Sequence, residues 1–256
     1  MSVELHHSVE GPEGAPVLLL GGALGTDLSV WDPQVPALAE SLRVVRFDHR
    51  GHGRSPVPPG PYEIADLAGD VLALMARLGV QRAHWCGLSL GAMVGLWLAA
   101  NAPEHVDRLV VMCTSAHMAP ASAWAQRAAA VLDAGTTAAV ADRIVDRWLT
   151  PAHAAAHPEE RRRLRDMLVS MPPDGYAACC GAIERMDLRD DLPRIAAPTL
   201  VIAGAGDLAT PPEHQRLIAG AIPGARLEVV ADAAHIAAVQ QPQTVNRLIL
   251  DHLEAG

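Results

Sequence analysis

The chain has 256 residues, half of them hydrophobic, which is enough to bury one large core. Its 29 acidic and 20 basic residues give a formal net charge of −9, which excludes the basic surface that nucleic acid or an anionic membrane requires. The N-terminus lacks the basic and apolar regions of a signal peptide, and no segment has about 18 uninterrupted apolar residues. We therefore expect a soluble, cytoplasmic protein with neither nucleic acid nor a membrane as partner.

The first half of the chain predicts strands that alternate with helices. Four short apolar runs are typical of strands buried in a sheet, at residues 17–20, 43–48, 83–86 and 106–114. Three stretches between them have helical composition or periodicity, at residues 31–40, 64–78 and 92–100. This alternation indicates an α/β fold with a mostly parallel central sheet flanked by helices.

The strand pattern stops between residues 115 and 192. Alanine-rich helical segments take its place, and they are separated by Gly135, Pro151, Pro158 and Pro172-Pro173. Strands are expected again at residues 198–204 and 225–230, with helices after Pro211 and over 242–253. We expect one core domain formed by residues 1–114 and 193–256, with residues 115–192 as a helical lid (cap) insertion over the carboxyl ends of the strands.

Four cysteines and twelve histidines raise the question of disulfides and metals. Cys86 and Cys113 fall on expected core strands and Cys179-Cys180 are adjacent, which is not the pattern of a disulfide framework. His49 and His52 have a spacing that could suit zinc, but no third ligand lies near them in the sequence. We expect reduced thiols and no metal.

The segment Gly87-Leu88-Ser89-Leu90-Gly91 fits the G-x-S-x-G pattern of a nucleophile elbow. A strand is expected before it and a helix after it, as that motif requires. The flanking glycines permit close backbone approach, and the sharp turn would raise Ser89 Oγ above the sheet, beside the positive end of a helix. We therefore predict that Ser89 is a catalytic nucleophile.

A serine hydroxyl needs a positioned base, which in turn needs an orienting carboxylate. Asp207 and His235 each follow an expected strand, so both fall at the sheet edge that carries Ser89, in the chain order of the α/β hydrolases. We expect His235 to be the base and Asp207 to orient it. The alternatives are that Asp207 only caps a helix and that Asp232, three residues before His235, competes as the orienting group.

Acyl transfer also requires donors for the developing oxyanion. The backbone N–H of Leu90, at the start of the elbow helix, is one candidate. The second is expected from the loop after the first central strand, where we choose the Leu24 N–H and hold the Ala23 N–H as the alternative.

Several segments together resemble the 3-oxoadipate enol-lactonases, which are cytoplasmic α/β hydrolases of the bacterial β-ketoadipate pathway for aromatic breakdown. The segments are 24–34, 50–55, 86–91 and 186–192, with further matches in the expected lid at Trp124, Arg127, 147–151 and 175–180. The resemblance covers nearly the whole chain. It implies an α/β-hydrolase fold, no cofactor, and opening of a small carboxylate-bearing lactone to 3-oxoadipate through a serine acyl-enzyme.

The resemblance also suggests how the substrate is held. Its carboxylate requires a cation, for which Arg127 is our candidate, with Trp124 forming part of the pocket wall. The alternative is that Arg127 lies on a solvated helix face and Trp124 is ordinary packing. Arg50, in the Arg-Gly-His-Gly loop, is interpreted as structural rather than as an anion-binding residue.

Two positions depart from the family pattern, since Gly22 stands where an Asn is usual and Ala92 where a second Gly is usual. Both leave the three expected catalytic residues intact, so they bear on the substrate more than on hydrolysis. Two rival functions stay open. One is a broad carboxylesterase or cofactor-free perhydrolase with the same catalytic residues; the other is a non-catalytic binding protein of this fold.

Overall fold

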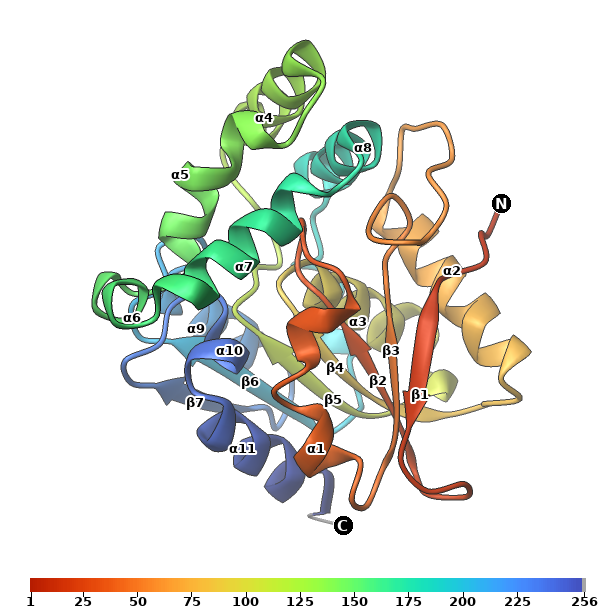
Figure 1. Ribbon diagram of the computed structural model, residues 1–256. Coiled ribbons are helices and arrows are strands. Elements are labelled where there is room, and N and C mark those ends of the chain that lie inside the picture. Colours follow the sequence, from red (N-terminus) through yellow and green to blue (C-terminus); the bar gives the residue numbers. More distant parts are fainter. Residues whose placement is uncertain (255–256) are drawn as a thin grey trace.

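The computed structural model describes residues 1–254 and places a seven-stranded sheet at the centre of the molecule (Figure 1). The strand order is β1-β3-β2-β4-β5-β6-β7, and β1 alone runs antiparallel to its neighbour. The strands are β1 (His7–Glu10), β2 (Val17–Gly21), β3 (Arg43–Phe47), β4 (Ala83–Leu88), β5 (Val106–Met112), β6 (Thr199–Gly204) and β7 (Arg226–Val230). This topology confirms the predicted α/β fold with a mostly parallel sheet.

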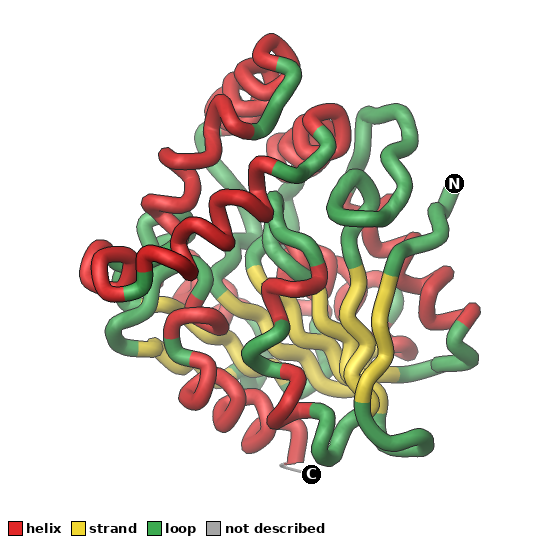
Figure 2. The backbone as a smooth tube through the Cα atoms, viewed as in Figure 1, coloured by secondary structure: helices red, strands yellow, loops and turns green. Residues whose placement is uncertain are grey.

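Helices cover both faces of the sheet (Figure 2). Helices α2 and α3 pack on each other against one face, while α1, α10 and α11 lie together on the other. The core helices are α1 (Val35–Leu38), α2 (Ile64–Arg77), α3 (Leu90–Asn101), α9 (Pro212–Ala221), α10 (Ala237–Gln240) and α11 (Pro242–Glu254). Burial on both faces explains why β4 and β6 are buried at every position and carry no polar alternation.

Five helices lie between β5 and β6 in the chain and group together at one end of the sheet (Figure 1). They are α4 (Ala121–Ala134), α5 (Ala138–Trp148), α6 (Pro151–Ala156), α7 (Pro158–Val169) and α8 (Pro173–Arg185). Gly135 ends α4 in the left-handed conformation. Helices α6, α7 and α8 each begin with a proline, whose ring fixes φ near the helical value. A lid with limits at residues 115 and 192 stays a prediction.

One local expectation was wrong, and one strand was not predicted. The helix expected over residues 31–40 is mostly turn: a 3₁₀ helix covers Leu28–Trp31, and α1 spans only Val35–Leu38. Asp27 caps the 3₁₀ helix by accepting a hydrogen bond from Ser29 N, so the helical segment begins earlier than Pro33 suggested. Strand β1 was not predicted, because a four-residue edge strand with the sequence His-Ser-Val-Glu has little apolar periodicity.

The structure also bears on thiols, metals and membrane spans. The four cysteines are buried and free, as expected. Among residues 1–254, no group of three or more His, Cys, Asp and Glu side chains is arranged to hold a metal ion. Within the same residues, every helix is too short or too polar to cross a bilayer.

Candidate active site

Ser89 lies at a strained turn between β4 and α3. Its φ of 52° and ψ of −108° lie outside the conformations that non-glycine residues usually adopt. The glycines on either side are required by packing: a Cβ on Gly87 would lie 2.4 Å from the Gly91 backbone, and a Cβ on Gly91 would lie 2.1 Å from Gly21 O. The elbow predicted from the sequence is therefore built by close approach of three backbone segments.

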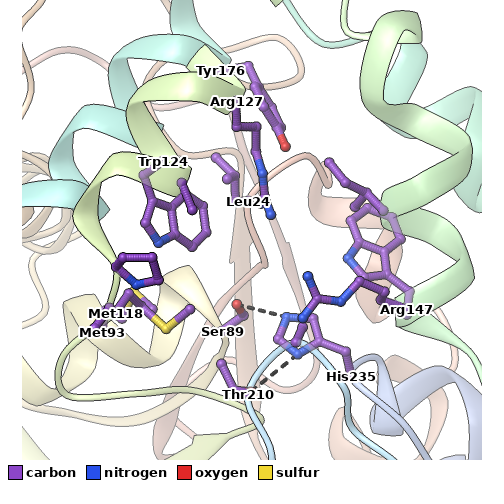
Figure 3. Close-up of a pocket in the computed structure, with 16 residues that line it drawn as sticks. Leu24, Ser89, Met93, Met118, Trp124, Arg127, Arg147, Tyr176, Thr210 and His235 are labelled. Carbon is purple, nitrogen blue, oxygen red and sulfur yellow. Dashed lines mark hydrogen bonds between the residues drawn. The ribbon is translucent and has the colours of Figure 1, made fainter. Parts of the chain in front are cut away.

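The three residues expected to form the catalytic relay come together at the carboxyl ends of their strands. His235 Nε2 lies 3.0 Å from Ser89 Oγ (Figure 3), and His235 Nδ1 lies 2.9 Å from Asp207 Oδ2. All three residues are buried. These distances are those of a nucleophile and base within reach of proton transfer, with a carboxylate orienting the base.

Asp207 is held by its own loop. Its Oδ1 accepts hydrogen bonds from the N–H groups of Ala209 and Thr210, and its Oδ2 accepts the Thr210 hydroxyl at 2.8 Å. Burial by itself raises the pKa of Asp207, but the nearby His235 and the hydrogen bonds from His235 and Thr210 outweigh it and lower the pKa. Asp232 is exposed, and it is Asp207 that contacts the imidazole.

The expected oxyanion donors lie beside the serine. Leu90 is the first residue of α3, so its N–H has no acceptor within the helix. Leu24 lines the same cavity as Ser89, and its N–H has no acceptor among residues 1–254. We retain Leu24 and Leu90 as the proposed donors.

Two buried histidines hold the loop that carries Leu24. His52 Nε2 accepts a hydrogen bond from Gly25 N at 2.9 Å, and His49 Nε2 donates to Gly22 O at 3.2 Å. Burial lowers the pKa of His49 to about 3, so His49 is neutral, and burial also lowers the pKa of His52. His52 Nε2 accepts the Gly25 hydrogen bond, so that nitrogen carries no proton. From the sequence we weighed these residues only as metal ligands, because contact between the two loops depends on the tertiary fold.

A cavity of about 270 Å³ opens above Ser89, between the sheet edge and helices α4, α5 and α8 (Figure 3). Its size and mainly apolar lining are typical of a site for a small molecule. Its walls are formed by Leu24, Ser89, Met93, Met118, Ala119, Pro120, Ala123, Trp124, Arg127, Ile144, Arg147, Trp148, Tyr176, Ala209, Thr210 and His235.

Trp124 and Arg127, the expected substrate-binding residues, both line this cavity. The Arg127 guanidinium stacks over the Trp124 ring, with Cζ 4.3 Å from the ring centroid. Arg127 Nε and the Tyr176 hydroxyl are buried without a hydrogen-bond partner among the described residues. A cation on the wall of a mainly apolar cavity, with no carboxylate paired to it among residues 1–254, is suited to bind an anion.

Three polar residues of the site were given no role from the sequence: Arg147, Tyr176 and Thr210. Arg147 and Tyr176 do lie in the segments 147–151 and 175–180 that carry the resemblance to the enol-lactonases. A usable signal existed for Thr210, since an Asp followed three residues later by Thr is typical of a capped turn. Arg147 and Tyr176 lie on helices whose buried face faces the cavity. Periodicity could not show which buried positions face a ligand.

Arg50 lies away from the cavity. Its guanidinium bonds to both carboxylate oxygens of Asp70, at 2.6 and 2.8 Å, and to the carbonyls of Met1 and Asp66. These contacts join the Arg-Gly-His-Gly loop to α2 and to the N-terminus. The structural interpretation of Arg50 is confirmed.

Comparison with known proteins places the chain among enzymes. Residues 15–242 match the family model described as the alpha/beta hydrolase fold. The chain is 38% identical to 3-oxoadipate enol-lactonase 2 of Acinetobacter baylyi over 96% of this chain and 92% of that protein. It is 34% identical to RutD of Stutzerimonas stutzeri, a protein named as a carbamate hydrolase, over 99% of this chain and 96% of that protein.

A solved structure gives the same result. The crystal structure of the enol-lactonase from Burkholderia xenovorans matches with a TM-score of 0.95 and 40% identity, over 97% of this chain and 96% of that one. At this identity and coverage the similarity extends through helices α4 to α8. The chain therefore belongs to the alpha/beta hydrolase family, in the group that includes the 3-oxoadipate enol-lactonases, and it is an enzyme whose serine, histidine and aspartate are arranged as a triad.

Proposed function

We propose that this enzyme hydrolyses 3-oxoadipate enol-lactone to 3-oxoadipate through an acyl-enzyme on Ser89. The observation that carries the proposal is that one cavity joins Ser89 to Arg127, a cation that forms no salt bridge among residues 1–254. The enol-lactone offers a ring ester for the serine and a carboxylate for the guanidinium. Two relatives named as 3-oxoadipate enol-lactonases, at 38% and 33% identity, support this substrate.

In the first half of the proposed reaction, Ser89 Oγ attacks the lactone carbonyl while His235 Nε2 takes its proton. Asp207 keeps the Nδ1–H tautomer and stabilises the imidazolium that forms. The N–H groups of Leu24 and Leu90 stabilise the negative oxygen of the tetrahedral intermediate. The ring oxygen then leaves as an enolate. The proton that His235 took from Ser89 passes to the enolate carbon, directly or through water, which gives the ketone and returns His235 to its neutral form.

In the second half, water attacks the acyl-enzyme. His235 removes a proton from the water and returns it to Ser89 Oγ as the ester bond breaks. The product has two carboxylates where the substrate had one. The chain's own groups suffice for each of these proton transfers.

We also propose a role in bacterial aromatic catabolism and a cytoplasmic location, because both follow from the family resemblance.

The test compares two lactones that share the unsaturated ring. One is 3-oxoadipate enol-lactone; the other is α-angelica lactone, which has a methyl group in place of the carboxymethyl group. We expect kcat/KM to be at least about tenfold higher for the enol-lactone, because Arg127 pairs with its carboxylate. Arg127→Gln should remove most of this preference. Equal turnover of the two lactones by the wild-type enzyme would contradict the proposed substrate.

The role of Ser89 has a separate test. A fluorophosphonate probe should label the wild-type enzyme and fail to label Ser89→Ala, since only an activated serine reacts. Labelling that persists in Ser89→Ala would place the nucleophile elsewhere. An intact protein that takes up no label would favour the non-catalytic alternative.

A second candidate function is carbamate hydrolysis. The observation that favours it is the 34% identity to RutD across 99% of the chain. The same serine, histidine and oxyanion donors would serve a carbamate carbonyl. Steady-state kinetics on a small carboxylate-bearing carbamate, run beside the enol-lactone, separates the two functions by the ratio of their kcat/KM values.

A further inference from the structure

Two arginines reach the cavity from different walls. Arg127 comes from α4 and Arg147 from the last turn of α5, and Figure 3 shows both side chains entering the space above Ser89, with Arg147 on the His235 side. None of the sixteen lining residues is acidic. Neither arginine forms a salt bridge with a carboxylate among residues 1–254.

Arg147 is a half-buried cation that the protein only partly satisfies. One of its amino groups donates to the Leu208 carbonyl, a neutral acceptor. The charged groups that act on it are Arg127 from α4, Arg143 from its own helix and Asp207 from the loop after β6. Burial, followed by the charge of Arg127, lowers the pKa of Arg147, although an arginine in a protein keeps its proton. Asp207 is already engaged by His235 and Thr210.

We propose that the cavity holds two anion subsites, Arg127 and Arg147, and that its preferred ligands are dicarboxylates that span them. The inference rests on the proposed function, because hydrolysis of a monoanionic lactone or ester creates a second carboxylate within the cavity. A second cation in the same space matches that added charge. Two like charges left without an acid partner are stabilised when a dianion binds between them.

The test measures binding directly, by isothermal titration calorimetry at constant ionic strength. The two ligands are adipate and adipamic acid, which has the same length but carries a neutral amide in place of one carboxylate. We expect adipate to bind the wild-type enzyme at least about tenfold more tightly, since a second charge-assisted pair forms. Equal dissociation constants of adipate and adipamic acid for the wild-type enzyme would by themselves overturn the proposal.

Variants assign the second subsite. Arg147→Gln should abolish the advantage of adipate while it changes the dissociation constant of adipamic acid by no more than about threefold, because Arg127 still binds one carboxylate. Arg147→Lys keeps the charge and should restore part of the advantage. Arg143→Gln is the matched control, one turn away on the same helix and outside the cavity, and should keep the full advantage.

A purely structural Arg147, which only anchors the Leu208 carbonyl, makes a different prediction. Its removal would weaken both ligands equally, and that result would overturn the proposal. Should Arg147→Gln fail to fold, the wild-type ratio and Arg147→Lys still decide the question. Two results separate this proposal from the proposed function. If the wild-type enzyme turns over the enol-lactone slowly but still prefers adipate, only the proposed substrate is wrong. If it turns over the enol-lactone normally but does not prefer adipate, only the second subsite is wrong.

Discussion

The hydroxyl of Thr210 donates a hydrogen bond of 2.8 Å to Asp207 Oδ2, the same carboxylate oxygen that faces the imidazole of His235. Thr210 Oγ1 also lies 3.4 Å from His235 Nδ1. The threonine therefore fixes the carboxylate on the side where it orients the base. We expect Thr210→Val to lower kcat by about tenfold with little change in KM, because the imidazole is held less well in the transition state.

Thr210→Ser is the control for this prediction, since it keeps the hydroxyl and removes only a methyl group. It should retain kcat within about twofold of the wild type. Steady-state kinetics on the best substrate gives both values. A loss of kcat in Thr210→Ser without a loss in Thr210→Val would show that the methyl packing, and not the hydroxyl, matters.

Gly22 is constrained by Thr26. A Cβ at residue 22 would lie 2.7 Å from Thr26 Oγ1, which is itself fixed by a 2.9 Å hydrogen bond to Ala23 O. Gly22→Ala should therefore destabilise the fold by about 1–3 kcal/mol through overpacking. Thr26→Ala should cost about 1 kcal/mol through loss of its hydrogen bond.

The two changes together should be less costly than their sum, because removal of Oγ1 makes room for the new methyl group. Urea unfolding of the two single variants and the double variant gives the coupling free energy, expected to be about 1 kcal/mol. Strict additivity would show that the loop relaxes in another way. In that case the Asn that is usual at residue 22 in the family would be accommodated by movement of the backbone, and not by a different side chain at residue 26.

The triad could be predicted from the sequence because each member follows a strand of a parallel sheet. Parallel strands place their carboxyl ends at one edge, so Ser89, Asp207 and His235 were expected to meet before any distance was known. The apolar runs of the central strands, which are buried on both faces, located those strands in the chain. Local sequence and topology were sufficient for this part of the site.

The rest of the site depends on contacts that no local pattern encodes. Arg147 reaches the cavity because α5 packs beside α4 and α7, and the direction of a buried helical face is set only by such packing. His49 and His52 act on the loop that follows β2 because β3 lies beside β2 in the sheet. Strand β1 was missed for the same reason, since its pairing with β3 stabilises a segment that has no pattern of its own.

The buried His49 should make the protein sensitive to acid. Its pKa in the folded state is about 3, whereas an unfolded histidine titrates near 6.5. The unfolded state thus binds more protons between these values, so the stability that is complete above about pH 6.5 is lost as the pH falls toward 3. At about 1.4 kcal/mol per pH unit, His49 alone should lower the free energy of unfolding by about 2 kcal/mol between pH 8 and pH 5.

His49→Gln tests this assignment. Glutamine can still donate to Gly22 O but does not titrate, so the loss of stability between pH 8 and pH 5 should shrink by about 2 kcal/mol. Urea unfolding at the two pH values gives the difference. His157→Gln, at an exposed position, is the matched control. The assignment fails if both variants show the same acid dependence as the wild type.

Arg50 and Asp70 form a buried ion pair, with the two side chains 5% and 1% exposed. Asp70→Asn leaves the guanidinium buried without a countercharge and weakens the bond from Val3 N, so we expect it to cost about 3–5 kcal/mol of stability. The double variant Arg50→Met with Asp70→Leu removes both charges and should be more stable than Asp70→Asn. Thermal unfolding of the three proteins ranks them. The ion pair lies outside the cavity, so kcat of the folded Asp70→Asn variant, measured at low temperature, should match that of the wild type. A large fall in kcat would mean that the Arg-Gly-His-Gly loop transmits strain to the oxyanion loop through His52, which contacts both Arg50 O and Gly25 N.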